Sequence, residues 1–336
     1  MNILVHTIYF PPEVGGLETH VLTLCQALQR RGHKVTVVTS RSIKGTKKTD
    51  EFEGVPVHRL WCPNKKFTGW VITSIAAIPI MWRLSKAAEL IHVHTFPSVV
   101  PAIFPRWFRK KPFVATMHTS HFLRLAKKTL WKIALRFLLN RPDIILAPSV
   151  EIRDVAMQLA NGIEAYAMVN AVDVKRFKPV EAKIHAENSE SIIIVPRRLF
   201  EKNGVEFAVR AMPIVRREID AHLYLIGDGP MKDKLEKLVE ELDIADVVHF
   251  LGKIPNVDMP AYISSADLIV IPSLMEATSV AGLESMACER PIVASNVGGL
   301  PEIVTNETGR LAEPGNYEDL AQKIIDVLKM TEKERS

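Results

Sequence analysis

Two glutamates, Glu276 and Glu284, are separated by seven neutral and mostly small residues, and an apolar run, Leu268–Ile271, precedes them. This pattern predicts a strand, a loop that holds Glu276, and a helix that holds Glu284. N–H groups in the first turn of a helix lack intrahelical partners, so they suit an anion such as phosphate. A carboxylate inside the helix can accept hydrogen bonds from two ribose hydroxyls, and one in the loop could hold a hydroxylated ring. The pattern therefore predicts a site for a phosphate, a pentose and a sugar, the parts of a nucleotide sugar.

The surrounding residues favour this site over a surface helix with two solvated glutamates. Thr278, Ser279 and Val280 are predicted to open the helix and to direct their N–H groups at the phosphate. A second apolar strand, Pro291–Ala294, leads into another tight loop at Gly298–Glu302. Ligands of open α/β sheets bind at loops that follow the carboxyl ends of strands.

The segment Pro272–Pro301 resembles the carboxyl-half signature of family 4 of the retaining glycosyltransferases, the glycogen-synthase-like group, whose motif is glutamate, seven residues, glutamate. The resemblance covers about residues 1–325. It implies the GT-B fold, in which two Rossmann-like α/β domains with doubly wound parallel sheets face each other across a cleft. It also implies transfer of a sugar from a nucleotide-diphosphate donor, UDP- or GDP-linked, to a hydroxyl group with the anomeric configuration retained. Glu276 would then orient the donor sugar, and Glu284 the ribose.

The resemblance implies no cofactor and no metal, and the sequence has no Asp-x-Asp metal motif. Catalysis would be mostly electrostatic, because cations and helix N-termini can stabilise a departing diphosphate. No well-placed general base is evident, so the leaving phosphate is expected to take the acceptor proton.

A glycine-containing loop, Pro11–Gly16, lies between the first predicted strand and a helix. Gly15 and Gly16 permit backbone angles closed to other residues and let a diphosphate approach the N–H groups. The alternative is a simple tight turn. The loop resembles the amino-domain glycine loop that closes over the donor in this family, which makes Gly15 and Gly16 candidate donor contacts.

His118 lies two residues after the predicted strand Phe113–Thr116, at its carboxyl end. A lone histidine in this position is more often structural than catalytic. The family places a histidine after this strand, near the transferred sugar, so the resemblance assigns that role to His118. His92, His94 and His121 are competitors, and His94 ends a neighbouring strand on the same edge of the sheet.

Arg198 and Lys202 follow the first strand of the second half, where cations could neutralise the leaving diphosphate. The alternative is a solvated surface charge run. The family pattern is Gly-Arg-Leu, three residues, then Lys-Gly. Here Pro196 and Arg197 replace the usual small residue and glycine, and Lys202 comes one place early, with Asn203 where lysine is expected. Arg198 is therefore the first candidate and Lys202 the second.

Two further segments are similar to family elements that shape the nucleotide pocket. The turn that begins at Gly227 follows a predicted strand, and the segment Phe250–Ile254 matches the one whose backbone holds the nucleotide base. Gly252 and Ile254 are its candidate contacts. Backbone contacts carry no side-chain code, so the sequence does not say which base is bound.

Length and element order define the frame that positions these residues. The chain has 336 residues with 47% hydrophobic and 24% charged residues, as expected for a globular enzyme of two domains. Strand and helix patterns alternate over residues 1–178, break in a polar linker, and restart over residues 190–328. We therefore predict a first, acceptor-side Rossmann-like domain and a second domain of the same class that binds the nucleotide sugar.

The net charge of +5 conceals a division between the two halves. Residues 1–180 hold 26 Lys and Arg against 11 Asp and Glu, whereas residues 181–336 hold 17 against 27. All five tryptophans also lie in the first half. Basic clusters at Arg109–Lys111 and Lys127–Lys128 predict that the first domain docks on an anionic membrane surface. The acceptor would then be a phospholipid or a lipid-linked sugar. The alternative is that the basic face only attracts the diphosphate and the tryptophans are core.

Compartment and membrane topology follow from three observations. The cysteines Cys25, Cys62 and Cys288 lie far apart, and the first residues lack the basic region and long apolar core of a signal peptide. We expect a cytoplasmic protein, peripheral on the inner membrane face. The uncharged run Phe67–Trp82 is too short for a typical bilayer span of about 20 residues, and is predicted to be a buried or an interfacial helix.

Two other functions compete with sugar transfer. A hydrolysing sugar-nucleotide epimerase on the same fold would need acid and base carboxylates and would release a free sugar epimer. A non-enzymatic nucleic-acid-binding protein would use the basic first half, but the acidic second half and the lack of an aromatic-plus-basic motif oppose it. The sequence leaves the oligomeric state open.

Overall fold

The computed structural model describes residues 1–336 except 14, 119, 161, 187–189 and 331–336. It divides the chain into two compact units, Met1–Ala171 and Val172–Ser336. Each unit is built around one largely parallel sheet with helices packed against it, so the predicted pair of α/β domains is confirmed.

The sheet of the first unit has eight strands in the order β3-β4-β2-β1-β5-β6-β7-β8. All neighbours pair in parallel except β3 and β4, which form an antiparallel edge. The strands are β1 Asn2–Thr7, β2 Lys34–Arg41, β3 Thr49–Phe52, β4 Val55–Trp61, β5 Leu90–His94, β6 Phe113–Thr116, β7 Ile144–Ala147 and β8 Glu164–Ala167. Parallel strands buried on both faces explain the near-continuous apolar runs in the sequence.

The chain order of this sheet reverses direction at β1. β2 pairs on one side of β1 and β5 on the other, with Thr7 opposite His94. Such a switch point opens a crevice at the carboxyl ends of the two strands, where ligands bind in open α/β sheets. The helices of this unit are α1 Gly16–Arg30, α2 Phe67–Ala76, α3 Ile78–Leu84, η1 Phe96–Ala102, α4 Ile103–Arg109, α5 Ser120–Ala126, α6 Thr129–Leu139 and α7 Val150–Leu159.

The uncharged run Phe67–Trp82 forms two short helices, α2 and α3, rather than one. Pro79 stands in the first turn of α3, where its missing N–H is tolerated. Among the described residues no single helix is long and apolar enough to cross a membrane, although α2 and α3 pass that test together as a pair bent by 42°.

The second unit has a six-stranded sheet, in which the pairings between described strands are parallel, in the order β11-β10-β9-β12-β13-β14. Its strands are β9 Ser191–Pro196, β10 Ala221–Ile226, β11 Val248–Gly252, β12 Leu268–Ile271, β13 Ile292–Ser295 and β14 Gly309–Ala312. Its helices are η2 Glu201–Asn203, α8 Val205–Val215, α9 Lys232–Glu241, α10 Met259–Ser264, α11 Val280–Ala287 and α12 Tyr317–Leu328.

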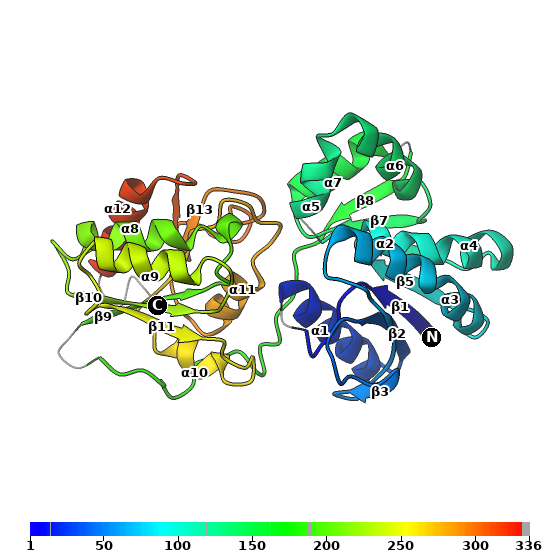
Figure 1. Ribbon diagram of the computed structural model, residues 1–336, viewed down its shortest axis with the longest axis horizontal. Helices are drawn as coiled ribbons and strands as arrows, with labels where there is room; N and C mark the ends of the chain where they lie inside the picture. Colours follow the sequence, from blue (N-terminus) through cyan, green and yellow to red (C-terminus); the bar gives the residue numbers. More distant parts are fainter. Residues whose placement is uncertain (14, 119, 161, 187–189, 331–336) are drawn as a thin grey trace. The chain divides into compact units, whose positions relative to one another are not determined.

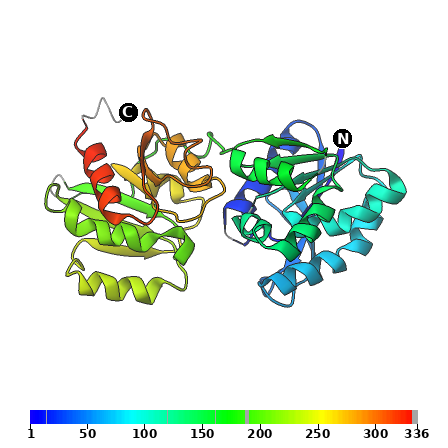
Figure 2. The same cartoon turned by 90° about the horizontal axis from the view of Figure 1, so that it is seen from above.

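Helices cover both faces of the second sheet. α8, α9 and α12 lie on one face and α10 and α11 on the other (Figure 1), and α12 stays beside α8 in the turned view (Figure 2). Side chains of β9 alternate between these layers: Ile193 and Val195 pack with the first group of helices, Ile192 and Ile194 with the second. This sheet also reverses direction, between β9 and β12, so the loops after these two strands begin next to each other.

Candidate functional site

The loop after β12 and the start of α11 form the predicted glutamate motif. Ser279 caps α11 by accepting a hydrogen bond from the Gly282 N–H at 3.1 Å, so the helix begins where the sequence predicts. Thr278, Ser279 and Val280 are buried at this start. Glu276 lies in the loop, and Glu284 lies one turn inside the helix.

Arg197 is the cation that contacts this loop. Its guanidinium forms an ion pair with Glu276 and donates to Ser273 Oγ at 2.9 Å, to Asn203 Oδ1 at 3.2 Å and to Ser279 Oγ at 3.4 Å. The Arg197 and Glu276 side chains are 12% and 14% exposed, so solvent screens the pair only partly. The arginine directly after β9 is thereby fixed at the mouth of the helix that holds Glu284.

Arg198, the candidate that the sequence favours, points elsewhere. Its side chain is exposed, and its guanidinium lies 5.4 Å from the centroid of the Phe200 ring. Arg197 rather than Arg198 therefore contacts the glutamate loop, and we expect the phosphate-binding role that the sequence predicts for Arg198 to belong to Arg197. Sequence reasoning missed Arg197 because the family pattern places its arginine one residue later.

Lys202 is tied to the same loop through its backbone. Its carbonyl accepts hydrogen bonds from the N–H groups of Leu274 and Met275, at 2.9 and 3.2 Å, and its side chain is exposed. Gly204 has a φ of +62°, and a Cβ there would lie 1.9 Å from the Pro272 carbonyl oxygen. A larger residue at 204 would push the segment with Lys202 away from the glutamate loop.

The glycine loop after β13 supports Glu276 from the other side. Gly298 has a φ of +59°, and a Cβ there would lie 1.9 Å from the Glu276 carbonyl oxygen. The Gly299 N–H donates to the Ala277 carbonyl at 3.0 Å. Glycine at 298 thus permits the close approach of the two loops that follow β12 and β13.

Glu284 is a buried carboxyl group that accepts a hydrogen bond from a neighbouring side chain. It is 6% exposed, and Asn256 Nδ2 donates to its Oε1 at 3.2 Å. Burial raises the pKa of Glu284 to about 7, because the hydrogen bond from Asn256 and the charge of Arg176 offset the desolvation only in part. A carboxyl group poised at this pKa is a candidate functional group.

The predicted base-binding segment lies on the neighbouring strands. The Gly227 N–H donates to the Gly252 carbonyl at 2.8 Å, which links the ends of β10 and β11. A Cβ on Gly227 would lie 2.2 Å from the Arg197 carbonyl oxygen, so this glycine lets β10 end against the arginine segment. Ile254 is partly buried against the core, and an open hollow beside it is also lined by Arg176 and Tyr262.

The pKa of Glu284 predicts how nucleotide affinity depends on pH. If the carboxylate accepts two ribose hydroxyls, binding favours the charged form, so affinity rises with pH up to about 7. Well below pH 7 the dissociation constant of a nucleoside diphosphate should grow about tenfold per pH unit. Calorimetry between pH 5.5 and 8 measures this. Glu284→Gln is the control, since it retains the diphosphate's own titration, and equal slopes in both proteins would contradict the assignment.

In the first unit, the predicted glycine loop begins α1. Gly15 is the residue before the helix, its carbonyl accepts the Thr19 N–H at 3.0 Å, and Gly16 is the first helical residue. A Cβ on Gly15 would lie 2.4 Å from Glu18 Oε2, so the buried Glu18 carboxylate fills the space that a side chain at 15 would need. Val14, which directly precedes Gly15 in this loop, lies outside the described residues.

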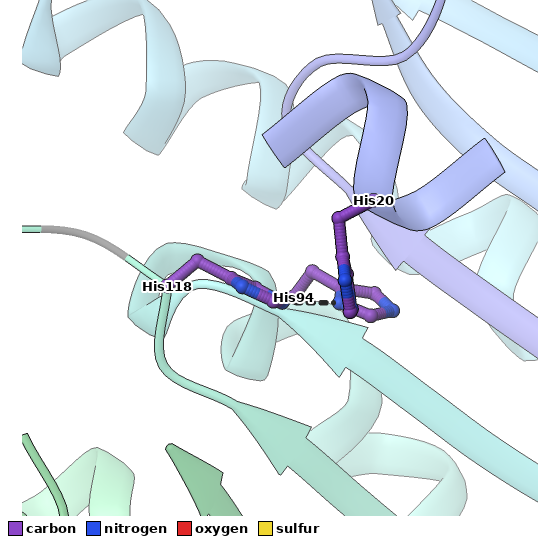
Figure 3. A group of neighbouring side chains, drawn as sticks. All are labelled: His20, His94 and His118. Carbon is purple, nitrogen blue, oxygen red and sulfur yellow. Dashed lines mark hydrogen bonds between the residues drawn. The ribbon is translucent and has the colours of Figure 1, made fainter. Parts of the chain in front are cut away.

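Three histidines gather at the switch point of the same unit (Figure 3). His94 Nδ1 and His118 Nε2 are hydrogen-bonded at 2.9 Å, and the centroid of the His20 ring lies 4.7 Å from that of His118. One donor atom from each of the three lies within 4.8 Å of the others, a spacing that could hold a metal ion. The sequence places His94 and His118 on one sheet edge, and His20 reaches them from α1.

This part of the unit keeps its histidines uncharged. Burial lowers the pKa of His118 and His94 well below the usual value, and that of His20 and His92 to about 4. His6 is fully buried and has no hydrogen-bond partner among the described residues, and its pKa falls to about 3. A neutral His118 can still donate a hydrogen bond to a sugar hydroxyl, or accept one from it, at pH 7.

The same burial predicts acid sensitivity of the first unit. A histidine with a lowered folded pKa binds fewer protons than in the unfolded chain, so its contribution is complete above pH 6.5 and is lost as pH falls toward 4. Each such histidine should lower the free energy of unfolding by about 1.4 kcal/mol for each pH unit below 6.5. Urea unfolding followed by tryptophan fluorescence reports this unit alone, because all five tryptophans lie in it. His6→Leu should weaken the dependence, and a midpoint unchanged from pH 7.5 to 5.5 would contradict the prediction.

Comparisons with known proteins agree with the division of the chain into two units. The family model described as Glycosyltransferase Family 4 matches residues 14–176, and that described as Glycosyl transferases group 1 matches residues 177–336. Glycogen synthase from Mycobacterium tuberculosis is 29% identical over 98% of this chain and 86% of its own length. One subunit of the phosphatidylinositol N-acetylglucosaminyltransferase from Homo sapiens is 25% identical over 93% of this chain and 66% of its own length.

Solved structures share the arrangement of two α/β domains. Sucrose-phosphate synthase from Thermosynechococcus elongatus matches with a TM-score of 0.86 at 22% identity, over 97% of this chain and 89% of its own. The Anabaena protein HepE, in complex with UDP and glucose, matches with a TM-score of 0.78 at 18% identity, over 100% and 92%. These likenesses concern the fold, and they confirm the predicted two-domain GT-B fold.

Proposed function

Because this chain is a family-4-like glycosyltransferase of the GT-B type, we propose that it moves a hexosyl group from a nucleotide-diphosphate sugar to a hydroxyl group with the anomeric configuration retained. The observation that carries the proposal is the meeting of Arg197, Glu276 and the start of α11 at the carboxyl ends of β9 and β12. The cation and the N–H groups at the helix start suit the diphosphate of a nucleotide-sugar donor, and the buried carboxylate of Glu284 suits its ribose.

In the proposed reaction the bond between the anomeric carbon and the phosphate oxygen breaks, and the acceptor oxygen forms the new bond. The charge that develops on the leaving diphosphate is stabilised by Arg197, by Lys202 and by the N–H groups that open α11. Glu276 orients the sugar, and the acceptor proton passes to the leaving phosphate oxygen. The roles that the family resemblance assigns to Gly15, Gly16 and His118 stay predictions.

The donor in this proposal is UDP- or GDP-linked. HepE, whose fold matches, is known in complex with UDP and glucose, which supports a nucleotide-sugar donor. We also propose that transfer needs no metal and no cofactor, so that activity survives a chelator. Such a result would leave any metal binding by His20, His94 and His118 outside the reaction.

For the acceptor, we propose a hydroxyl group on a phospholipid or lipid-linked sugar, and a cytoplasmic enzyme that is peripheral on the inner membrane face. The strongly basic first half supports an anionic surface as its partner. One relative is by name part of a phosphatidylinositol N-acetylglucosaminyltransferase, which supports a lipid acceptor for a chain of this family.

The two competing functions are not favoured. Both family models describe glycosyl transferases, which supports transfer over a hydrolysing epimerase. The candidate nucleotide site lies in the acidic second half, whose negative charge opposes binding of a nucleic acid.

A donor screen tests the proposal. Radiolabelled UDP- and GDP-sugars are incubated with the enzyme and with either a membrane extract or soluble sugars, and the label is followed into lipid and water phases. We expect label from one donor in the lipid phase. Label in no product with any donor would contradict the proposed transfer, whereas label only in a soluble product would contradict the lipid acceptor.

A further inference from the structure

Helix α4 presents large aromatic side chains to solvent. Phe104, Trp107 and Phe108 are 42%, 52% and 69% exposed. Residues three and four apart lie on one face of a helix, so these three side chains form a single surface. The Phe104 and Phe108 rings stack with their centroids 6.1 Å apart. Single exposed apolar residues are common on proteins, but a contiguous aromatic group is not.

Helix α6 repeats this feature. Leu130, Ile133 and Phe137, at spacings of three and four, are 85%, 71% and 46% exposed, while Leu135 and Leu139 on the opposite side are fully buried. The helix is thus apolar on both sides, and only one side packs against the unit. Lys132 and Arg136 flank the exposed stripe and are themselves exposed.

The two exposed groups join into one surface. The Arg141 guanidinium lies 4.1 Å from the Phe137 ring centroid and 5.5 Å from that of Trp107, so it bridges α6 and α4. On the far side of α4, the Trp82 ring lies 6.3 Å from the Phe108 ring. We call this surface the α4–α6 face. It comprises Trp82, Phe104, Trp107, Phe108, Leu130, Ile133, Phe137 and Arg141.

The segment that carries the α4–α6 face is strongly basic, and Asp143, the residue that follows it, is paired with Arg106 of α4. Residues 90–142 contain ten lysines and arginines and no aspartate or glutamate. Lys110, Lys127, Lys128 and Lys132 are exposed in or beside the two helices. A surface that combines exposed tryptophan, phenylalanine and leucine with lysine and arginine matches the interface of an anionic bilayer, where apolar groups enter the acyl boundary and cations meet the headgroups.

We propose that the α4–α6 face docks on an anionic lipid bilayer. Two copies of the chain are disfavoured as mutual occupants, because each would bring the same excess of positive charge. The docking itself is argued from the surface alone, and only the lipid acceptor in this inference rests on the proposed function. α4 follows β5 and η1, and α5 and α6 follow β6, so the docked helices continue from the strands that lead to His94 and His118. A lipid-borne hydroxyl group would therefore be presented to the unit that holds these histidines.

Vesicle sedimentation at low salt tests the docking. The full-length protein should pellet with vesicles of phosphatidylcholine and phosphatidylglycerol and remain largely in solution with phosphatidylcholine alone. Ile133→Gln/Phe137→Gln should weaken the binding about tenfold or more, since two apolar anchors are lost. Lys132→Glu should weaken it about fivefold or more, because each basic residue near an anionic surface contributes about 1 kcal/mol. The matched control is Lys237→Glu on the exposed side of α9, which should bind as the parent does.

Three results would overturn the proposal: equal and negligible pelleting with both vesicle types, an effect of Lys237→Glu as large as that of Lys132→Glu, or self-association that the Ile133→Gln/Phe137→Gln variant abolishes in the absence of vesicle binding. Nucleoside diphosphate affinity, measured by calorimetry on the same variants, separates this failure from that of the proposed function. Parent-like nucleotide affinity with no vesicle binding would refute the docking alone, and the donor screen tests transfer independently.

Discussion

Arg197→Ala is expected to lower kcat roughly 100- to 1000-fold, the usual loss when one fixed donor to a developing negative charge is removed. The guanidinium is held at the start of α11 by Ser273, Asn203 and Ser279, and it pairs with Glu276 in this structure. Such a group needs little reorganisation when the diphosphate charge develops. Steady-state kinetics with the donor from the screen measures the loss.

Arg198→Ala is the matched control, because it removes the same group one residue away. Its exposed guanidinium over Phe200 predicts activity close to that of the parent. Arg197→Lys should restore only part of the activity, since an ammonium group cannot reproduce the several directed contacts. A large loss in Arg198→Ala with little loss in Arg197→Ala would restore the assignment that the sequence favours.

Glu284→Gln is expected to weaken nucleoside diphosphate binding roughly 10- to 150-fold, as the loss of hydrogen bonds to a charged acceptor costs about 1.5–3 kcal/mol. The buried carboxyl group accepts a hydrogen bond from Asn256 at one oxygen, and a carboxylate has further acceptor capacity for ribose hydroxyls. Isothermal titration with UDP and GDP, well above pH 7, measures the affinity when the carboxyl group is charged.

Glu276→Gln makes the comparison specific. Glu276 should act on the sugar, so this variant is expected to lose turnover with a smaller effect on nucleoside diphosphate affinity. Arg197 keeps its contacts with Ser273 and Asn203 in that variant, which preserves the phosphate site. If both glutamate variants bind nucleoside diphosphate and turn over as the parent does, the site does not hold the donor.

The sequence predicted the second sheet closely, because buried parallel strands are continuous apolar runs bounded by glycine, proline and polar residues. β12 has the bounds expected from its pattern. The edge strands β3 and β8 went unpredicted, since their alternately exposed residues lack an apolar run and their pairing depends on tertiary context. The edge strand of the second sheet, β14, also went unpredicted, because its four residues include a glycine and an arginine and form no apolar run.

At the site, the glutamate loop could be predicted and the arginine could not. Side chains of neighbouring residues in an extended segment point to opposite sides. After β9 the N–H groups of Arg197 and Phe200 donate to the carbonyls of Val195 and Arg198, respectively, at 3.0 and 2.8 Å. These tight turns reset the alternation, so which of two adjacent arginines faces Glu276 depends on backbone geometry that the sequence does not display.

The histidine group shows the same limit. His94 ends β5 and His118 lies just after β6, and the common direction of these parallel strands brings both histidines to one edge of the sheet. His20 lies on α1, and its contact with His118 depends on how that helix is rotated against the sheet. Packing of side chains far apart in the chain sets that rotation.

The most direct test of sugar transfer with retention is a proton NMR time course of one reaction mixture that holds the enzyme, its α-linked nucleotide-sugar donor and its acceptor. We predict that nucleoside diphosphate and glycosylated acceptor appear in equal amounts, and that the first product signal has the coupling of an α-anomer. A free sugar epimer formed with the nucleoside diphosphate, or a first product with the β-configuration, would contradict the account.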